Sequence, residues 1–415
     1  MKTGAFMCNF LLVAAMTIAF MSMPAACSEV GQEDGNVEFK PIVLTKAQSE
    51  VLVKGNDFGF KLLRETIAEN GIENNIFLSP LGVTIVSSML ANGAAGATYD
   101  EIVETIGMKG LSLDQVNSCY STLVSGLYKA DVAVNLSLAN SIWVGSGLNL
   151  RKNFRTNMEK TFDAESFSVD FAASGTLKQV NDWCSKKTSG LIPKMFDQLD
   201  PRVRMLLINA LYFKGTWVHT FSEKNTLQDD FQTLAGTTVK VPMMFQQESL
   251  EVYRDKTVTL VRMPYGNGAF VMEAVVPTGD FKKFMEYFSP SRLEGWSKGA
   301  VVTPTELFFP KFTTEFDTEE MLVPVLNRLG MKRAFTSAAD FSNMSDEGLY
   351  VDKFRQKSYI TVDEKGTQAA AVTVAEMRKN GGSSNMTVVR FDRPFVYLIR
   401  EKSTGAILFI GTKVK

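Results

Sequence analysis

The sequence predicts an α+β fold organised around a large β-sheet. Two observations lead to this class: amphipathic helical patterns are concentrated early in the chain, and strand-like apolar runs are concentrated late. A third observation is the capacity for a large core, because the 415 residues are 45% hydrophobic and include 30 phenylalanines. No internal repeat and no Pro/Gly-rich linker divides the chain after its N-terminal segment, so the sequence offers no domain boundary there.

The N-terminal stretch MKTGAFMCNFLLVAAMTIAFMSMPAAC is typical of an export signal. It has one early lysine, an apolar run from Ala5 to Met23, and small residues before Cys27. The motif Pro24-Ala25-Ala26-Cys27 resembles a bacterial lipobox, in which the cysteine becomes the lipidated first residue, although proline stands where leucine is usual. We expect a signal peptide over residues 1–26 and a lipid on Cys27, with simple secretion as the alternative.

Residues 27–45 are expected to form an acidic flexible tether. The stretch SEVGQEDGNVEFKP, which directly follows Cys27, is polar, acidic and free of periodic apolar residues. Acidic residues directly after such a cysteine resemble the surface-export signal of some Gram-negative lipoproteins. The expected location is therefore the outer membrane or cell surface as a lipoprotein, and otherwise the periplasm or the medium.

Helical patterns come next along the chain, from Ser49 to Met108. A buried helix begins after Ser79-Pro80, because proline is tolerated in the first turn of a helix. Further helices are expected around Asp114 to Leu127 and Leu177 to Cys184. The apolar face of the first helix is formed by Val53, Phe58, Phe60, Leu62, Leu63 and Ile67.

Strands and buried apolar runs dominate from Arg204 onward. Their concentration in this part of the chain is what favours α+β over an alternating α/β order. The runs are RMLLINALYFKGTW, TVTLVRMPY, AFVMEAVVP, TELFFPKFTTEF, KSYITVDE, MTVVRFDRPFVYLIRE and GAILFIGTKV.

The residues that catalysis would need are scarce. His219 is the single histidine, and no nucleophile-elbow spacing lies near it, so an exported hydrolase with this residue as base is poorly supported. Zinc spacing and a phosphate-binding glycine loop are both lacking, so we expect no catalytic residues, no metal and no cofactor. A net charge of −1 with scattered lysines and arginines argues against nucleic acid. Cys119 and Cys184 are expected to be free thiols.

Several segments, in order and at near-family spacing from about Lys46 to Val414, resemble the serpin (serine protease inhibitor) family. The resemblance implies one α+β domain over residues 46–415, with three sheets, about nine helices and an exposed reactive-centre loop at about 364–390. We also expect a monomer that touches a membrane only through the N-terminal lipid. The segments are NNIFLSPLGVTIVSSMLANGAAGATYDEI, LSLANSIWV, VNDWCSKKTSGLI, INALYFKGTWVHTF, ADFSNMSDEGLYVDKFRQKSYITVDEKGTQAAA and FDRPFVYLIREKSTGAILFIGTKV.

The family's activity implies a mechanism for the stretch VDEKGTQAAAVTVAEMRKNGGSSNM. A target endopeptidase cleaves the loop, is held as an acyl-enzyme, and is displaced when the cleaved loop enters the large sheet as a new strand. Gly366 supplies the turn, and alternate residues from Thr367 are small enough to enter a packed sheet. The hinge is expected to comprise Glu364, Lys365, Gly366, Thr367, Gln368, Ala369, Ala370 and Ala371.

Other positions carry over from the resemblance one by one. Trp217 matches the tryptophan beneath the point where the loop enters the sheet, and Lys311 matches the partner of Glu364. Ser79 and Asn209 match the polar group that holds the closed sheet together. The family's usual histidine in that group falls on Gln356, which can donate and accept hydrogen bonds but does not titrate near neutral pH.

The resemblance leaves several positions open for the scissile bond. Counting from Gly366 places it between Asn380 and Gly381, and counting back from Phe391 points nearer Ser383. Trypsin-like pockets prefer basic residues, which favours a cut after Lys379 or Arg378, and Met377 is a further alternative. Expected targets are serine endopeptidases, trypsin-like ones first, with cysteine endopeptidases as a further class. The alternative function is a non-inhibitory binding protein with the same fold.

Overall fold

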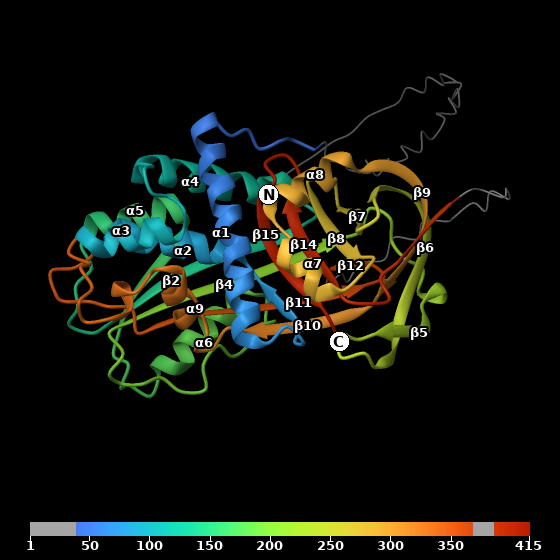
Figure 1. Cartoon of the computed structure of the whole chain (residues 1–415). Coiled ribbons are helices and arrows are strands. Elements are labelled where there is room, and N and C mark those ends of the chain that lie inside the picture. Colours follow the sequence, from blue (N-terminus) through green and yellow to red (C-terminus); the bar gives the residue numbers. More distant parts are fainter. Residues whose placement is uncertain (1–38, 368–385) are drawn as a thin grey trace, which may run out of the picture. The chain divides into compact units, whose positions relative to one another are not determined.

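The structure is a computed structural model that describes residues 39–367 and 386–415 (Figure 1). Two short 3-10 helices and fifteen strands accompany nine α-helices in these ranges. The α-helices are α1 (Lys46–Asn70), α2 (Pro80–Gly93), α3 (Gly96–Thr105), α4 (Leu113–Ala130), α5 (Lys152–Phe162), α6 (Thr176–Lys187), α7 (Phe281–Tyr287), α8 (Pro290–Gly299) and α9 (Leu322–Leu329).

The strands form two hydrogen-bonded sheets. The six-stranded sheet has the order β10-β11-β12-β4-β2-β3, and the other sheet has the order β1-β15-β14-β8-β7-β6-β9-β13 with β5 beside β6. The strands are β1 (Ile76–Leu78), β2 (Asn135–Gly145), β3 (Ala164–Val169), β4 (Met205–Thr216), β5 (Leu227–Gln232), β6 (Thr238–Arg254), β7 (Val258–Tyr265), β8 (Phe270–Pro277), β9 (Val301–Pro310), β10 (Phe312–Asp317), β11 (Lys353–Asp363), β12 (Gly366–Thr367), β13 (Thr387–Arg390), β14 (Phe395–Glu401) and β15 (Ile407–Lys413).

Local sequence signals explain where the first helices begin. Thr45 and Gln48 form a reciprocal capping box at the start of α1, which satisfies backbone donors that have no partner inside the helix. Ser79 caps α2 by accepting from the Gly82 N–H at 3.1 Å, and Pro80 occupies the first helical position. Nearly all of α2 is buried, because it runs through the middle of the molecule between the sheets and the other helices.

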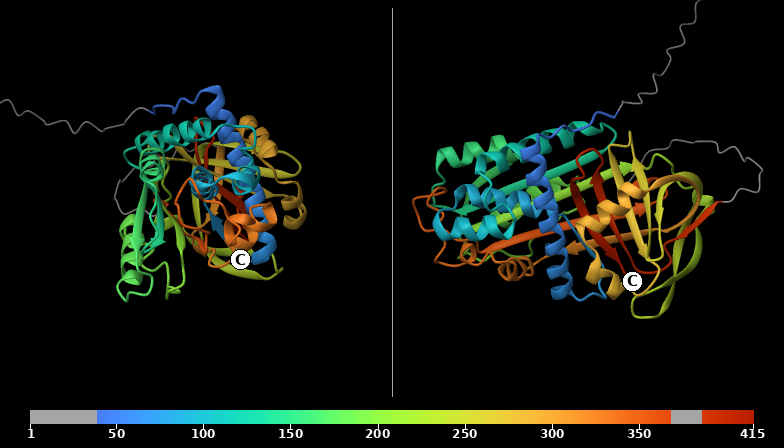
Figure 2. Two further views of the ribbon diagram at one scale, coloured as in Figure 1. Left: turned by 90° about the vertical axis from the view of Figure 1, so that its left-hand side faces the viewer. Right: turned by 45° about the horizontal axis from the view of Figure 1, so that its top comes forward.

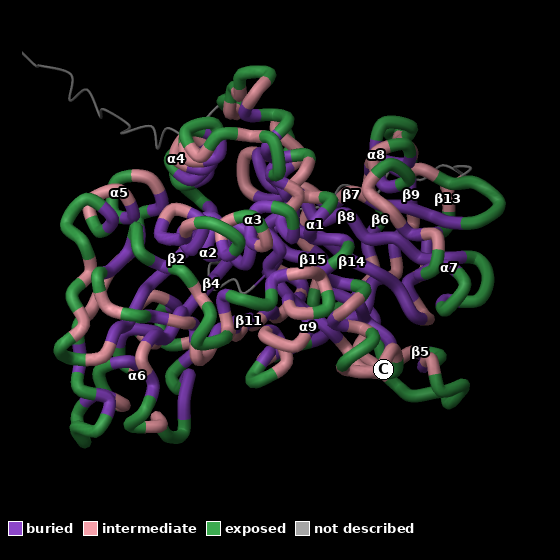
Figure 3. Tube along the Cα trace, turned by 60° about the vertical axis from the view of Figure 1, so that its left-hand side comes forward, coloured by how far each residue is buried: buried purple, intermediate pink, exposed green. Residues whose placement is uncertain are grey.

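The two faces of β4 pack against different layers. Leu207, Leu211 and Phe213 belong to the main core, which also contains α1, α2 and α4. Leu206 and Ile208 point the other way, into a smaller cluster formed with α6 and the segment that follows it. Figure 2 shows α6 on the opposite side of these strands from α2 and α4, and Figure 3 shows the buried residues concentrated along the strands.

The expected three sheets appear as two because one long strand is shared. The 17 residues of β6 pair with β9 over Met243–Val252 and with β7 over Glu251–Arg254. Hydrogen bonding therefore continues through β6 from one group of strands to another. The first group is β5-β6-β9-β13, and the second is β6-β7-β8-β14-β15-β1. The α+β class with a large sheet and nine α-helices in the described ranges agrees with the expectation.

Several elements differ from the expected pattern, although the helices predicted around 114–127 and 177–184 are present as α4 and α6. The run TELFFPKFTTEF is broken at Lys311 into β9 and β10, and MTVVRFDRPFVYLIRE is broken into β13 and β14. Pro310 ends β9 directly before the first break and Pro394 lies in the second, and proline donates no ladder hydrogen bond. Helices α5, α7, α8 and α9 were not predicted.

Candidate functional site

The candidate site is the line along which β4 and β11 meet, which we call the seam. These two strands are parallel neighbours and pair directly from Leu206 to Ala210 and from Lys353 to Lys357. At the other end of the seam, the short β12 lies between them and pairs antiparallel with both. Thr367 therefore has Gly215 of β4 on one side and Val362 of β11 on the other.

Gly366 permits the turn that brings β12 into this position. Its φ of 153° lies in the region that side chains disfavour. A Cβ at this position would overlap the carbonyl oxygen of Gly215 and the backbone of Thr216. Both the conformation and the close approach of β4 therefore require glycine.

The turn before Gly366 is held by the chain that follows β4. The Trp217 backbone N–H donates to the Lys365 carbonyl at 2.9 Å, and its indole N–H donates to the Asp363 carbonyl at 3.0 Å. The Phe221 N–H donates to the Glu364 carbonyl at 2.8 Å. Trp217 thus lies directly beside the turn that precedes Gly366.

Tyr265, at the end of β7, is a contact that sequence reasoning missed. Its ring stacks on Trp217 with centroids 4.2 Å apart, and its hydroxyl shares a 2.6 Å hydrogen bond with the Thr367 hydroxyl. Burial raises the pKa of Tyr265 well above its usual value, so the hydroxyl stays protonated at neutral pH. Nothing in RMPYGNG distinguishes this tyrosine from an ordinary strand residue, because the contact depends on the folding of β12.

Glu364 and Lys311 form an ion pair at the same end of the seam. Lys311 Nζ lies 2.8 Å from Glu364 Oε2, and the Thr226 hydroxyl donates to Oε1 at 2.8 Å. Burial opposes ionisation of Glu364, but hydrogen bonds from Lys311, its own backbone N–H and Thr226 lower its pKa below the usual value of a glutamate. The hydrogen bond to Glu364 raises the pKa of Lys311.

Ser79, Asn209 and Gln356 are brought together where the seam is closed. All three are fully buried. The Gln356 amide donates to the Asn209 side-chain oxygen at 2.7 Å and to the Ser79 carbonyl at 3.0 Å, and accepts from the Ser79 N–H at 2.8 Å. Asn209 in turn donates to Asn140 on β2 at 2.7 Å, which was not anticipated. The bond between Gln356 of β11 and Asn209 of β4 crosses the seam directly, so these strands cannot separate without breaking it.

The other expected site positions lie outside the described residues. They are the lipidated Cys27, the remainder of the hinge (Gln368, Ala369, Ala370, Ala371) and the candidate cleavage positions (Met377, Arg378, Lys379, Asn380, Gly381).

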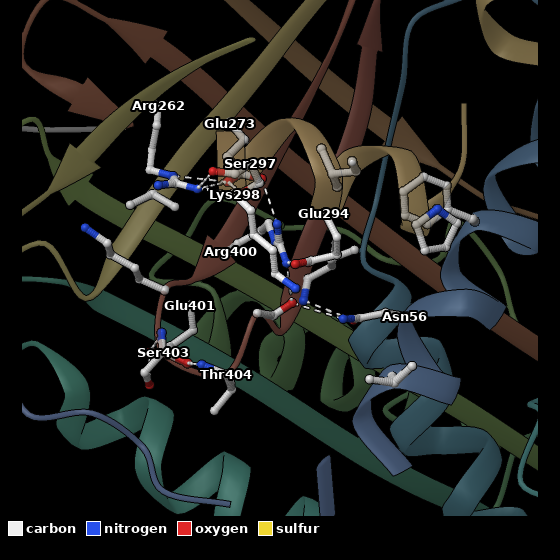
Figure 4. Close-up of a pocket in the computed structure, with 18 of the residues that line it drawn as sticks. Asn56, Arg262, Glu273, Glu294, Ser297, Lys298, Arg400, Glu401, Ser403 and Thr404 are labelled. Carbon is white, nitrogen blue, oxygen red and sulfur yellow. Dashed lines mark hydrogen bonds and ion pairs between the residues drawn. The ribbon is translucent and has the colours of Figure 1, made fainter. Parts of the chain in front are cut away.

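A second candidate site is a cavity of about 540 Å³ between α1, α8 and the turn joining β14 to β15. Arg400 and Arg262 both pair with the buried Glu273 at 2.8 Å, as Figure 4 shows. Burial opposes ionisation of Glu273, but the two arginines and the Ser297 hydroxyl keep its pKa below the usual value of a glutamate. The buried Nε of Arg400 has no hydrogen-bond partner among the described residues. Phe60 and Leu293 add apolar surface to the lining.

The family model described as serpin (serine protease inhibitor) matches residues 54–415. The chain belongs to the serpin family. Among its relatives, mouse (Mus musculus) Serpin A9 is 30% identical over 378 residues, which cover 89% of this serpin and 90% of the relative. Rat (Rattus norvegicus) alpha-1-antiproteinase is 28% identical over 412 residues, 97% of each chain.

Solved structures give the same fold. Human thyroxine-binding globulin, in complex with thyroxine, superimposes with a TM-score of 0.82 at 28% identity and covers 89% of this serpin and 99% of the globulin chain. The relatives therefore include an antiproteinase and a hormone-binding protein by name. Within the two described ranges, no helix of this serpin has both the length and the apolar composition needed to cross a membrane.

Proposed function

We propose that this serpin is an irreversible inhibitor of serine endopeptidases that acts by strand insertion. The target's serine attacks the carbonyl of the residue before the cut, an acyl ester forms, and the new amino terminus leaves. The cleaved loop then enters the seam and carries the attached endopeptidase away. Water cannot complete hydrolysis of the ester once the endopeptidase has been displaced and distorted, so the complex persists.

The register of β12 is the observation that carries this proposal. β12 runs antiparallel to both neighbours. If the strand continued after Thr367, the partner of each further residue would therefore be one position earlier in β4 and one position earlier in β11. Continued in this way, Glu376 falls opposite Leu206 and also opposite Lys353, two residues that are already direct partners. The two independent registers therefore agree, and a further strand fits the seam without a bulge.

The side chains of the loop suit that register. Thr373 would fall between Gln356 and Asn209, the two side chains whose hydrogen bond now closes the seam. Its hydroxyl can both donate and accept, so it can replace the bond that insertion breaks. The other residues that would share its buried face are Ala369, Ala371 and Ala375, which need little space.

Trypsin-like endopeptidases are the proposed first class of target, because Arg378 and Lys379 are the basic residues near the expected cut. Incubation with trypsin should give a complex that survives denaturing gel electrophoresis, and mass spectrometry of the complex should locate the new C-terminus between Met377 and Gly381. A cut outside that range would remove every proposed scissile bond. Cysteine endopeptidases are a further proposed class.

Thr367→Arg is the matched control for the mechanism. Thr367 is buried between the strands, so a long charged side chain there should block insertion while leaving the cleavage site intact. We expect Thr367→Arg to be cleaved by trypsin without forming the stable complex, and Thr367→Ser to form it. A wild-type chain that is only cleaved would reject the inhibitory function.

A second candidate function, ligand binding without inhibition, is favoured by the cavity around Arg400. An amphipathic ligand could place an anionic group at the unpartnered Arg400 Nε and its apolar body against Phe60 and Leu293. Thyroxine is a suitable first probe, because one solved relative is a thyroxine complex. Saturable binding that is lost in Leu293→Asp, together with cleavage by trypsin but no stable complex, would favour this function.

Export as a bacterial lipoprotein is proposed separately, from the N-terminal sequence. It comprises a signal peptide over residues 1–26, a lipid on Cys27, and a tether that joins a domain over residues 46–415. Expressed in a Gram-negative host, the wild-type chain should partition into detergent and show the mass of a chain that begins at a lipid-modified Cys27. Cys27→Ser should be soluble; if the two chains partition alike, lipidation is rejected.

A further inference from the structure

A separate cavity of about 220 Å³, which we call the arginine cavity, lies at the end of β13. Its lining includes Arg254 at the end of β6, Arg390 at the end of β13, and Arg393 in the connection that leads to β14. Among the described residues that line it, Asp392 is the single acidic one. Because Arg254 lies far from the other two arginines in the sequence, the fold creates this cluster of positive charge.

Arg254 is held beside β13 by two uncharged groups. Its Nε donates to the Thr259 hydroxyl at 3.2 Å, and its Nη2 donates to the Val388 carbonyl at 2.6 Å. Because neither partner carries a negative charge, these bonds orient the guanidinium without compensating its charge. An anion that enters the cavity would therefore meet a cation that is already in place.

Arg390 and Arg393 share one carboxylate. Arg390 Nε lies 3.3 Å from Asp392 Oδ2, and Arg393 Nη1 lies 2.8 Å from Asp392 Oδ1. Arg390 pairs in addition with Asp229 of β5. The Nε of Arg393 donates to the Pro277 carbonyl at 3.2 Å. Two carboxylates thus contact these two arginines, so the third guanidinium of the cluster leaves one positive charge in excess.

Most N–H groups of the three guanidiniums are still available to a ligand. Each guanidinium has five N–H donors and uses two of them in the contacts just described. Three donors on each, nine in total, have no partner in these contacts. A guanidinium binds two oxygens of one anion side by side, and a phosphate group offers such pairs of oxygens to more than one guanidinium at once.

We propose that the arginine cavity binds the phosphate group of inorganic phosphate or of a phosphate monoester. The cavity has room for it, because its volume equals that of about seven molecules of liquid water at roughly 30 Å³ each. A bound phosphate would bridge Arg254 of β6 to Arg390 and Arg393, which lie at and just after the end of β13.

Such a bridge would strengthen the attachment of a short strand. β13 has four residues and lies beside β9 at the edge of its sheet (Figure 3). A ligand that binds the folded chain and not the unfolded chain stabilises the folded chain. The binding requires neither cleavage nor an endopeptidase, so this inference does not depend on the proposed inhibitory function.

Titration of the full chain with sodium phosphate tests the proposal, at about pH 8, where phosphate is mainly a dianion. Sodium chloride at the same ionic strength is the reference. Calorimetry should show saturable binding of one phosphate per chain. The midpoint of thermal unfolding should rise by about 1–3 °C when the phosphate concentration is about ten times the Kd.

Arg254→Gln removes one guanidinium from the cavity and should raise the Kd for phosphate at least about tenfold. Lys256→Gln is the matched control, because it removes the same charge from an exposed position outside the cavity lining. It should leave the Kd within about twofold of the wild-type value. Arg393→Gln gives a second measurement from the other side of the cavity, in case Arg254→Gln folds poorly, and should weaken binding by a similar factor.

Flotation with vesicles separates free phosphate from a lipid headgroup as the source of the phosphate group. The vesicles contain phosphatidylcholine with or without phosphatidic acid, and the chain carries Cys27→Ser so that no N-terminal lipid contributes. Flotation that requires phosphatidic acid and is lost in Arg254→Gln would support the proposal with a lipid as the source. The proposal is overturned if the wild type shows neither saturable phosphate binding nor such flotation. Equal Kd values in Arg254→Gln, Arg393→Gln and Lys256→Gln would also overturn it.

Discussion

At the scale of single residues, Gln356 decides how the closed seam responds to pH. Its side chain makes three hydrogen bonds to Ser79 and Asn209, and the partners of these bonds are buried backbone groups and a buried amide. An amide side chain neither gains nor loses a proton in the physiological range. We therefore expect seam opening in the wild type to lack a histidine-like midpoint near pH 6–7, roughly the range of an unperturbed imidazole.

Gln356→His should introduce such a midpoint. Burial disfavours the imidazolium, so the pKa of the new histidine should fall below about 6.5. The neutral imidazole stabilises the closed form above that pH, and this stability is lost as the pH falls through the folded-state pKa. Thermal unfolding between about pH 5 and 8 would measure it, together with uptake of a synthetic peptide that has the sequence of residues 368–380 and reports opening of the seam.

His219→Ala provides the background for these measurements, because His219 is the single native histidine. In that background, Gln356→Ala should show no midpoint. A midpoint in the wild type that disappears in Gln356→Ala would contradict the expectation.

Lys311→Met should weaken the hinge. The pKa of Glu364 is lowered in the folded chain, so its contribution to stability is present above its unfolded pKa of about 4.3 and is lost as the pH falls through the folded-state pKa. Because the Lys311 side chain is 43% exposed, we expect a loss of only about 1 kcal/mol in the free energy of unfolding at pH 7.

Denaturant unfolding of Lys311→Met at pH 7 and at about pH 3 would check this, since the difference from wild type should shrink once Glu364 is protonated. Lys61→Met, on the exposed surface of α1, is the control. An equal loss in both variants would mean that the ion pair contributes nothing to the hinge.

At the scale of secondary-structure elements, Glu273 joins four of them. From β8 it pairs with Arg262 of β7 and Arg400 of β14, and it accepts from Ser297 of α8 at 2.6 Å. Glu273→Gln removes the charge that two buried arginines need, so we expect a loss of about 3–5 kcal/mol in the free energy of unfolding. Chemical denaturation at pH 7 measures it.

Glu294→Gln is the matched control for that variant, because Glu294 also pairs with Arg400 but is 45% exposed. We expect it to cost less than about 1 kcal/mol. In the wild type, the pKa of Glu273 is lowered in the folded chain. Its contribution to the free energy of unfolding is therefore fully present above its unfolded pKa of about 4.3, and it is lost as the pH falls through the folded-state pKa. Similar losses in the two variants would show that Glu273 does not connect these elements.

An element could be predicted where its own sequence carries the pattern of its structure, and it could not where its stability comes from pairing with a distant segment. β4, β7, β8, β14 and β15 were predicted because they are long apolar runs buried on both faces. β5, with the sequence LQDDFQ, shows no such pattern, because its stability comes from pairing with β6. Helices α7 and α8 escaped prediction because they have only 7 and 10 residues.

The candidate site divides in the same way. Ser79, Asn209, Gln356, Trp217 and the Glu364–Lys311 pair were named by resemblance. In the structure, Gln356 contacts Asn209, Trp217 contacts Asp363 and Lys311 contacts Glu364, while their roles stay predictions. The contact of Tyr265 with Thr367 and that of Arg355 with Phe196 could not be found in this way. They join residues that are far apart in the sequence, with no spacing or composition to mark them.

At the scale of the whole molecule, the six-stranded sheet of the described residues has a very short strand at its centre. Among these residues, β12 contributes Gly366 and Thr367 between β4 and β11, and farther along the two strands pair directly over five residues each. A longer strand at this place would pair with both neighbours. On the proposed inhibitory function, we therefore expect the closed sheet to be less stable than the sheet that forms once the loop is cut and inserted.

Cleavage of the loop should therefore raise the thermal stability of the whole molecule. Insertion of residues 368–376 would add on the order of ten ladder hydrogen bonds beyond those broken along the seam, each contributing about 1 kcal/mol. A domain of this size shifts by roughly 1–2 °C per kcal/mol, so the midpoint of thermal unfolding should rise by more than about 10 °C. Calorimetry before and after limited cleavage by trypsin measures this rise. Thr367→Arg, in which the first buried position is blocked, should be cleaved without gaining stability, and an equal gain in that variant would mean that the rise does not come from strand insertion.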